Sequence, residues 1–317
     1  MYSSSKIGDF NFYFRKEKLK SISYRKYGYI FVIPFLLFFF VFTLYPTLYT
    51  FIMSFTDTAN YDPNTLGNFV WFDTYISVFK DKTFWLAIMR TLKIWGVNVV
   101  LQFGLALLLA ALFNDQSLKI KGQGAFKFAY YLPNIITAAT IGLLVRQALE
   151  ANGAVNVIMS KLVKNWERKE FLLDETFCQM TTSIVLTWIW YGNTMIVLLA
   201  GMAGINPTLY EAARIDGANS PQQFFYITLP LLKTILLYAF VTSLAGGLQM
   251  YDVPFFFNPQ SHTQTVAIKI YIWGFTGNNQ YGRAAAGSII MLIFTMLISS
   301  VLFFLMNIKT DSKPKKA

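Results

Sequence analysis

Two long apolar runs of the sequence are separated by the polar stretch Tyr210-Glu-Ala-Ala-Arg-Ile-Asp-Gly-Ala-Asn-Ser-Pro221, which continues to Ile227-Thr-Leu-Pro230. Asn206 is suited to cap a helix that begins at Pro207, because proline at the first helical position loses no hydrogen bond. Gly217 is placed to end that helix in a left-handed conformation. The sequence thus predicts one short helix before the glycine.

A second helix is predicted directly after this turn. Ser220 precedes Pro221, and Gln223 follows the serine by three residues, which is the pattern of a capping box. The segment 206–230, which we call the island, therefore reads as two short, rigid helices joined by a glycine turn.

The composition points to a membrane protein. Of 317 residues, 55% are hydrophobic and only 14% are charged, which is too apolar for an ordinary soluble domain. The net charge of +11 is concentrated at the chain ends and in particular loops, which is typical of membrane orientation and not of a nucleic-acid-binding face. Cys178 is the only cysteine and His262 the only histidine, so disulfides within the chain and cysteine or His-pair metal sites are excluded.

Six apolar runs are long enough to cross a bilayer, and the predicted fold is an all-α, polytopic membrane protein. Kinks are expected at Pro34, Pro46 and Pro133. The tails 1–26 and 309–317 are basic and flank a transmembrane domain over residues 27–308, and residues 251–283 are predicted to be an extramembranous loop. The predicted spans are residues 27–55, 84–113, 125–149, 178–205, 229–250 and 284–306.

The charges of the connecting segments orient these spans. Both tails and the loop 114–124 are basic, whereas the loops on the other side are acidic or nearly neutral. The positive-inside rule therefore places both termini, and with them the island, in the cytoplasm. The tail 1–26 fits either a disordered segment or a helix lying on anionic lipid headgroups.

The island carries a motif. The spacing Glu-Ala-Ala-x3-Gly-x9-Ile-x-Leu-Pro is met in full by Glu211, Ala212, Ala213, Gly217, Ile227, Leu229 and Pro230. It resembles the EAA loop of binding-protein-dependent ABC importer permeases, in the form found in the MalF-type, sugar-importing branch. Pro46, Phe55-Thr56-Asp57 and Tyr131-Leu132-Pro133 resemble that branch too, and the resemblance covers nearly the whole chain. The large extracellular insertion of the maltose permease is missing.

This resemblance implies a coupling helix that docks in a cleft of a separate ATPase subunit. Glu211 would face a basic or polar group there, and closure of the ATPases would swing the spans from inward-facing to outward-facing. ATP and magnesium would belong to the partner ATPase, and no cofactor is expected in this chain. The implied ATPase-coupling residues are Glu211, Ala212, Ala213, Arg214, Asp216, Gly217 and Pro230.

The resemblance also implies partners and a location. The expected partners are a second, homologous permease, an ATPase dimer, an extracellular substrate-binding protein, a sugar or oligosaccharide and the lipid bilayer, with no nucleic acid. The expected location is the bacterial plasma (inner) membrane.

A sugar site needs aromatic faces and a few amides or carboxylates, and two spans offer them. The resemblance points to the same places. The candidates are Thr187, Trp188, Tyr191 and Asn193 in the fourth span and Gly247, Gln249, Tyr251 and Asp252 at the end of the fifth. The same aromatic residues would also suit helix packing or the membrane interface.

Two other classes of protein fit the sequence less well. A secondary transporter or channel working alone would need acidic or basic groups in mid-span, and few are present. A membrane-bound enzyme would gather His, Cys or carboxylate groups at a span end, and the sequence shows no such cluster, so no enzymatic activity is expected. The sequence names neither the sugar nor the subunits that line its site.

Overall fold

The computed structural model describes residues 25–58, 67–115, 118, 120–257, 262–276 and 279–307. These residues are helical with no strand, apart from one isolated bridge between Thr56 and Phe69, so the all-α prediction is confirmed. Five helices are long and apolar enough to cross a membrane, or six if one sharply bent pair counts as a single span. The chain forms two compact units, residues 1–49 and 50–317, and each is described by itself.

The first unit holds helix α1 (Arg25–Phe39), the π-helical turn η1 (Phe40–Leu44) and the start of α2 (Tyr45–Met53). The predicted tails 1–26 and 309–317 fall almost entirely outside the described residues. The Tyr45-Pro46 pair directly follows η1, and the Tyr45 N–H donates to the Phe40 carbonyl, five residues back. The wider turn fits a proline, which lacks an N–H and whose ring collides with the carbonyl four residues before it.

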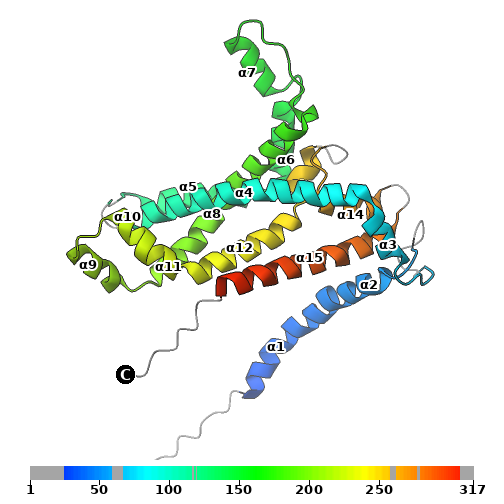
Figure 1. The fold of residues 1–317 in the computed structure, drawn as a ribbon, viewed down its shortest axis with the longest axis horizontal. Helices are drawn as coiled ribbons and strands as arrows, with labels where there is room; N and C mark the ends of the chain where they lie inside the picture. The colour runs from blue at the N-terminus through cyan, green and yellow to red at the C-terminus, as the bar shows by residue number, and fades with distance from the viewer. Residues whose placement is uncertain are drawn as a thin grey trace, which may run out of the picture. The chain divides into compact units, whose positions relative to one another are not determined.

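The second unit is built around two long parallel helices, α4 (Lys82–Asn114) and α8 (Glu175–Ala203), which pack along their lengths (Figure 1). Helix α12 (Lys233–Leu248) packs on both, helix α15 (Tyr281–Asn307) packs on α12, and the short α3 (Asp73–Lys80) packs on α15 and α4. The island lies at one end of α4, and α3 and α14 lie at the other, which we call the far end (Figure 1).

The predicted third span is broken. Instead of one helix kinked at Pro133, the chain forms α5 (Gln123–Ile135) and α6 (Ala138–Leu149), and the helices on either side of the break diverge by 82°. Pro133 lies inside α5, and the break falls at Ile136 and Thr137, both of which are extended. Three consecutive β-branched residues from Ile135 to Thr137 have low helix propensity, which accounts for a break there. The following loop contains α7 (Ala154–Leu162) and the 3-10 turn η3 (Phe171–Leu173).

The segment 251–283, predicted to be an extramembranous loop, contains two helices. Helix α12 ends at Leu248, but after a short break the chain continues as α13 (Asp252–Phe257), so that the fifth apolar segment runs to Phe257. A further helix, α14 (Val266–Phe275), packs on α15 and α4. Val253 and Phe257 are buried with Ile141 and Leu149 of α6. The packing on α6 holds α13 in place, and the α6 residues that provide it are more than a hundred positions away in the sequence.

An ion pair joins three helices at the far end. Asp81 caps α4 by accepting hydrogen bonds from the Thr83 N–H at 2.7 Å and its hydroxyl at 2.6 Å. It also accepts one from Arg283 Nη2 of α15 at 2.6 Å, while the guanidinium lies over the Trp273 ring of α14. Partial burial works against ionisation of Asp81, but the Thr83 hydrogen bonds and the charges of Lys269 and Arg283 outweigh it. The pKa of Asp81 therefore lies below its ordinary value.

We expect Asp81→Asn to lower the free energy of unfolding at pH 7 by about 1–3 kcal/mol, between the values for exposed and buried ion pairs. Because the folded-state pKa of Asp81 is lowered, its contribution is present above the unfolded pKa of about 4 and disappears as pH falls through the folded pKa. Thermal unfolding in detergent from pH 7 downward should show the two proteins converging below about pH 4. Glu167→Gln, at an exposed position, is the control. An Asp81→Asn variant that unfolds like its parent at pH 7 would contradict this role.

Candidate functional site

The island forms the two predicted short helices. Asn206 accepts a hydrogen bond from the Thr208 N–H at 3.1 Å, and α9 (Pro207–Ile215) begins at Pro207. Gly217 has φ of +81°, a left-handed conformation that favours glycine. Both features agree with the sequence-based prediction.

The start of the second helix, α10 (Ser220–Gln223), is one residue earlier than predicted. Asn219, not Ser220, is the cap: its side chain accepts from the Gln222 N–H, and the Gln222 side chain accepts from the Asn219 N–H. Gln223, predicted to complete the box, donates instead to the Ala218 carbonyl. Asn and Ser are equally good caps, and the extended backbone at Asn219 decides between them.

The island then re-enters the bundle through a second π-helical turn, η4 (Phe224–Thr228), followed by α11 (Leu229–Leu231). As at Pro46, this turn directly precedes the Leu229-Pro230 pair, and the Leu229 N–H donates to the Phe224 carbonyl. The hydroxyls of Tyr210 and Thr228 lie 2.9 Å apart and join α9 to η4. The hydroxyl contact therefore holds the two ends of the island together, and η4 and α11 connect the island to the bundle.

The predicted coupling residues lie on an accessible surface. Glu211, Ala212, Arg214, Asp216, Gly217 and Pro230 are exposed, and Ala213 is half-buried. The Ile215 side chain, between Arg214 and Asp216, is 88% exposed. Within the described part of the chain, neither Glu211 nor Arg214 forms an ion pair.

A groove of about 890 Å³ separates the island from the ends of α4 and α8. Leu108 and Leu112 of α4 and Phe225 of η4 supply apolar walls, and Glu211 and Arg214 also line the groove. The island thus presents charged and apolar side chains together.

A second cavity, of about 350 Å³, lies between α4, α8 and the junction of α12 with α13. Five of the eight cargo candidates line it: Asn193, Gly247, Gln249, Tyr251 and Asp252. The break at Gln249–Tyr251 between the two helices brings the last three to the wall.

The other three candidates lie elsewhere. Thr187 is buried and donates to Asn98 Oδ1 of α4 at 3.1 Å, a contact between helices. Trp188 is exposed and does not line the cavity, and the Tyr191 ring packs edge-on against Tyr130 of α5. These positions match the packing or interface role that the sequence left open.

Several lining residues were missed by the sequence analysis. On α4, Asn98 Nδ2 donates to Gln102 Oε1 at 3.2 Å, and Gln102 Nε2 donates to Thr194 Oγ1 at 2.7 Å. One feature of the sequence could have identified them: Asn98 and Gln102 lie one turn apart on the same face of a long apolar segment. Polar residues within membrane spans usually face the protein interior, so this spacing indicates an interior polar site. Other missed lining residues are Tyr238, Thr242 and Ser243.

Gly247 permits the close contact of α12 with α4 beside the cavity. A Cβ at this position would lie 2.0 Å from Cδ1 of Trp95, whose indole N–H donates to the Ser243 carbonyl at 3.1 Å. The role of Gly247 is therefore to let Trp95 approach, and any larger side chain would displace a cavity wall.

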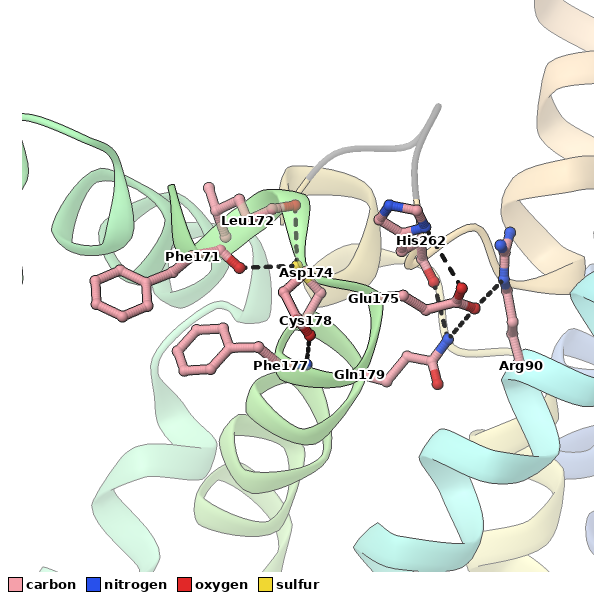
Figure 2. Close-up of polar contacts among 9 residues, drawn as sticks. All are labelled: Arg90, Phe171, Leu172, Asp174, Glu175, Phe177, Cys178, Gln179 and His262. Carbon is pink, nitrogen blue, oxygen red and sulfur yellow. Dashed lines mark hydrogen bonds and ion pairs between the residues drawn. The ribbon is translucent and has the colours of Figure 1, made fainter. Parts of the chain in front are cut away.

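A polar cluster joins α4, α8 and the segment before α14 (Figure 2). The Glu175 carboxylate lies 3.2 Å from Arg90 Nε and 3.7 Å from His262 Nδ1. Gln179 Nε2 donates both to this carboxylate and to the His262 carbonyl. Among the described residues, no three His, Cys, Asp or Glu side chains gather where they could hold a metal ion. The cluster acts as a link between helices.

These features define a class: an all-helical, multi-pass membrane protein with a polar cavity within the bundle and an exposed helical loop at one end. No protein-family model matches the chain. It is 28% identical over 282 residues to the lactose transport system permease protein LacF of Rhizobium radiobacter, covering 87% of this chain and 93% of that protein. It is 29% identical over 279 residues to the arabinooligosaccharides transport system permease protein AraP of Bacillus subtilis (strain 168), covering 86% of each.

The fold matches that of a bacterial ABC transporter involved in the import of the acidic polysaccharide alginate, with a TM-score of 0.76 and 24% identity over 92% of this chain and 98% of that one. A second structure of an alginate ABC transporter, in complex with alginate pentasaccharide-bound periplasmic protein, matches with a TM-score of 0.75, at the same identity and coverage. The curated homologues are thus permeases of sugar transport systems, and the chain has the fold of an ABC importer permease. The resemblance predicted from the island is confirmed.

Proposed function

We propose that this chain is the permease subunit of an ATP-driven importer that takes up a sugar or oligosaccharide delivered by an extracellular binding protein. A second, similar permease completes the pathway, and a separate ATPase dimer, which holds ATP and magnesium, drives alternating access through residues 206–230. The permease lies in the bacterial plasma membrane with its termini and island in the cytoplasm. Relatives named for sugar transport, and a fold neighbour crystallised with its periplasmic protein, support this reading.

The observation that carries the proposal is the exposed island. Two capped helices, a hydroxyl contact and a π-turn hold its shape, yet the side chains of Glu211, Arg214 and Ile215 remain exposed. A rigid loop attached to two spans transmits the motion of whatever binds it, because its helices move as one body. An ATPase docked there would move α8 and α12 directly.

The cavity supplies the proposed cargo site. Its described lining contains amides, hydroxyls and aromatic rings, with Asp252 the only carboxylate and no Lys, Arg or His. Amide and hydroxyl groups suit the hydroxyls of a sugar, and aromatic faces suit its apolar side. An acidic cargo would meet Asp252 with no cation beside it in this part of the chain, so we propose an uncharged sugar.

A secondary transporter working alone is the alternative. Coupling to protons or ions requires ionisable groups inside the membrane. The fully buried polar side chains among the described residues are Ser, Thr, Asn and Gln, with no buried carboxylate or amine. This composition favours an external energy source.

The deciding experiment measures sugar uptake in cells, or in proteoliposomes containing the purified complex, with and without the ATPase subunit. We expect uptake to stop when the ATPase is removed or when ATP is replaced by a non-hydrolysable analogue. Uptake that continues without the ATPase would favour the stand-alone transporter.

We expect Asn193→Ala to reduce the rate of uptake at sugar concentrations well below saturation about 5–10-fold, the effect of losing one hydrogen bond of roughly 1 kcal/mol. Asn193 lines the cavity, whereas Trp188, five residues earlier on α8, does not. Trp188→Phe is therefore the matched control and should leave the rate unchanged. If Trp188→Phe is the more damaging variant, the cargo contacts the other face of α8.

A further inference from the structure

A patch of five exposed aromatic residues and one isoleucine surrounds α3 at the far end of the bundle. Its six members are all 43–66% exposed, and we call them the aromatic rim: Phe69, Trp71, Phe72, Ile76, Phe79 and Trp85. Phe72, Ile76 and Phe79 follow a spacing of three and four residues, so they share one face of α3. The rim is larger than the scattered apolar residues of an ordinary protein surface.

The opposite face of α3 is fixed to the protein. Val78 is fully buried, and the Tyr75 hydroxyl lies 2.6 Å from the Ser54 hydroxyl. The Thr74 hydroxyl donates to the Ser54 carbonyl. Because these contacts hold the helix in one rotation, the rim cannot turn inward and stays directed away from the bundle.

The rim is also organised within itself. The Phe69 and Trp71 rings meet edge to face at 5.0 Å, and the Trp85 indole N–H donates to the Phe79 carbonyl at 2.9 Å. Trp71 has φ of +51°, a conformation that bulky residues rarely adopt and that costs about 1–2 kcal/mol. The chain therefore holds an indole outward at an energetic cost, which burial of that ring in an apolar medium would offset.

A third face of α3 is polar. Asp73, Ser77 and Lys80 are exposed and lie about 100° from the aromatic face by helical geometry. Helix α3 thus has a protein side, an apolar side and a polar side, and at eight residues it is too short to span a bilayer. This three-way division is expected of a helix lying in the plane of a membrane interface.

The rim continues onto exposed residues of the adjoining apolar helix. Trp85, Leu86 and Met89 are exposed on the first turns of α4, the adjoining apolar span. Lys80 and Lys82 are exposed at the same level, where their ammonium groups reach lipid phosphates while the stems lie along apolar surface.

We propose that the aromatic rim lies in the headgroup–acyl boundary of the bilayer leaflet at the far end, so that α3 is an interfacial anchor whose partner is phospholipid. Anchored there, α3 holds the starts of α4 and α15 at a fixed depth. This inference is independent of the cargo and of the ATPase.

The single cysteine provides a clean test, since Cys178→Ala gives a cysteine-free background. Ile76→Cys on the aromatic face and Ser77→Cys on the polar face are then labelled with an environment-sensitive fluorophore. The full chain, with the subunits that co-purify with it, is placed in phosphatidylcholine–phosphatidylglycerol nanodiscs. Quenching is measured with nitroxide-labelled lipids and separately with aqueous iodide.

We expect the label at 76 to lose most of its fluorescence to nitroxide lipids and little to iodide, and the label at 77 to show the reverse. Quenching at 76 by iodide alone means that the rim faces water and overturns the proposal. Protection at 76 from both quenchers means that a protein surface covers the rim, which also overturns it.

Discussion

Glu211→Lys is expected to abolish sugar uptake while the protein still inserts into the membrane in normal amount. Glu211 is exposed on α9 and makes no ion pair within the described chain, so its replacement disturbs no internal contact. If it meets a basic or polar group of the ATPase, a lysine there substitutes repulsion for a charge-assisted contact. Losing one partner of such a contact costs about 2–5 kcal/mol, which corresponds to roughly 30-fold or more in binding.

The measurements are uptake, membrane abundance and co-purification of the ATPase with the permease. Glu167→Lys is the matched control, since it reverses an exposed carboxylate in the loop after α7 and should change none of the three. Normal uptake by Glu211→Lys would remove the island from the coupling path. Lost uptake with a retained ATPase would mean that Glu211 transmits motion without holding the subunits together.

The island could be predicted from sequence because its structure is local. Asn206, Pro207 and Gly217 act through their own backbone geometry, and each occupies the predicted role. The one-residue error at Asn219 arose where two good caps are adjacent, so that propensity alone does not choose between them.

The structures of α13 and of the cavity, in contrast, depend on contacts between residues that are far apart in the sequence. Helix α13 exists because Val253 and Phe257 pack on α6, and no local pattern distinguishes that from a loop containing apolar residues. In α8, the residue types predicted a sugar site, but only packing shows that Asn193 lines the cavity while Thr187 bonds to Asn98. Rotation of a helix that is apolar nearly all round is set by its neighbours, and sequence periodicity does not reveal it.

Gly192→Ala is expected to prevent α5 and α8 from packing, and to lower the free energy of unfolding by more than about 3 kcal/mol, above the usual range for overpacking. A Cβ at this position would lie 2.0 Å from the carbonyl oxygen of Tyr130 and 3.0 Å from Cα of Tyr131. Both are backbone atoms, so no side chain can rotate to make room and the whole of α5 must shift. Glycine permits such close approach between membrane helices.

Thermal unfolding in detergent and the yield of folded protein from membranes would measure this effect. Gly96→Ala on α4 is the control, because nothing lies within 4 Å of a Cβ built there. That variant should be neutral or more stable by up to about 1 kcal/mol, the gain in helix propensity. Asn193 adjoins Gly192, so surviving Gly192→Ala protein should also transport poorly, because a shifted α8 moves the cavity wall. Unchanged stability of Gly192→Ala would mean that α5 lies farther from α8 in the membrane than the structure places it.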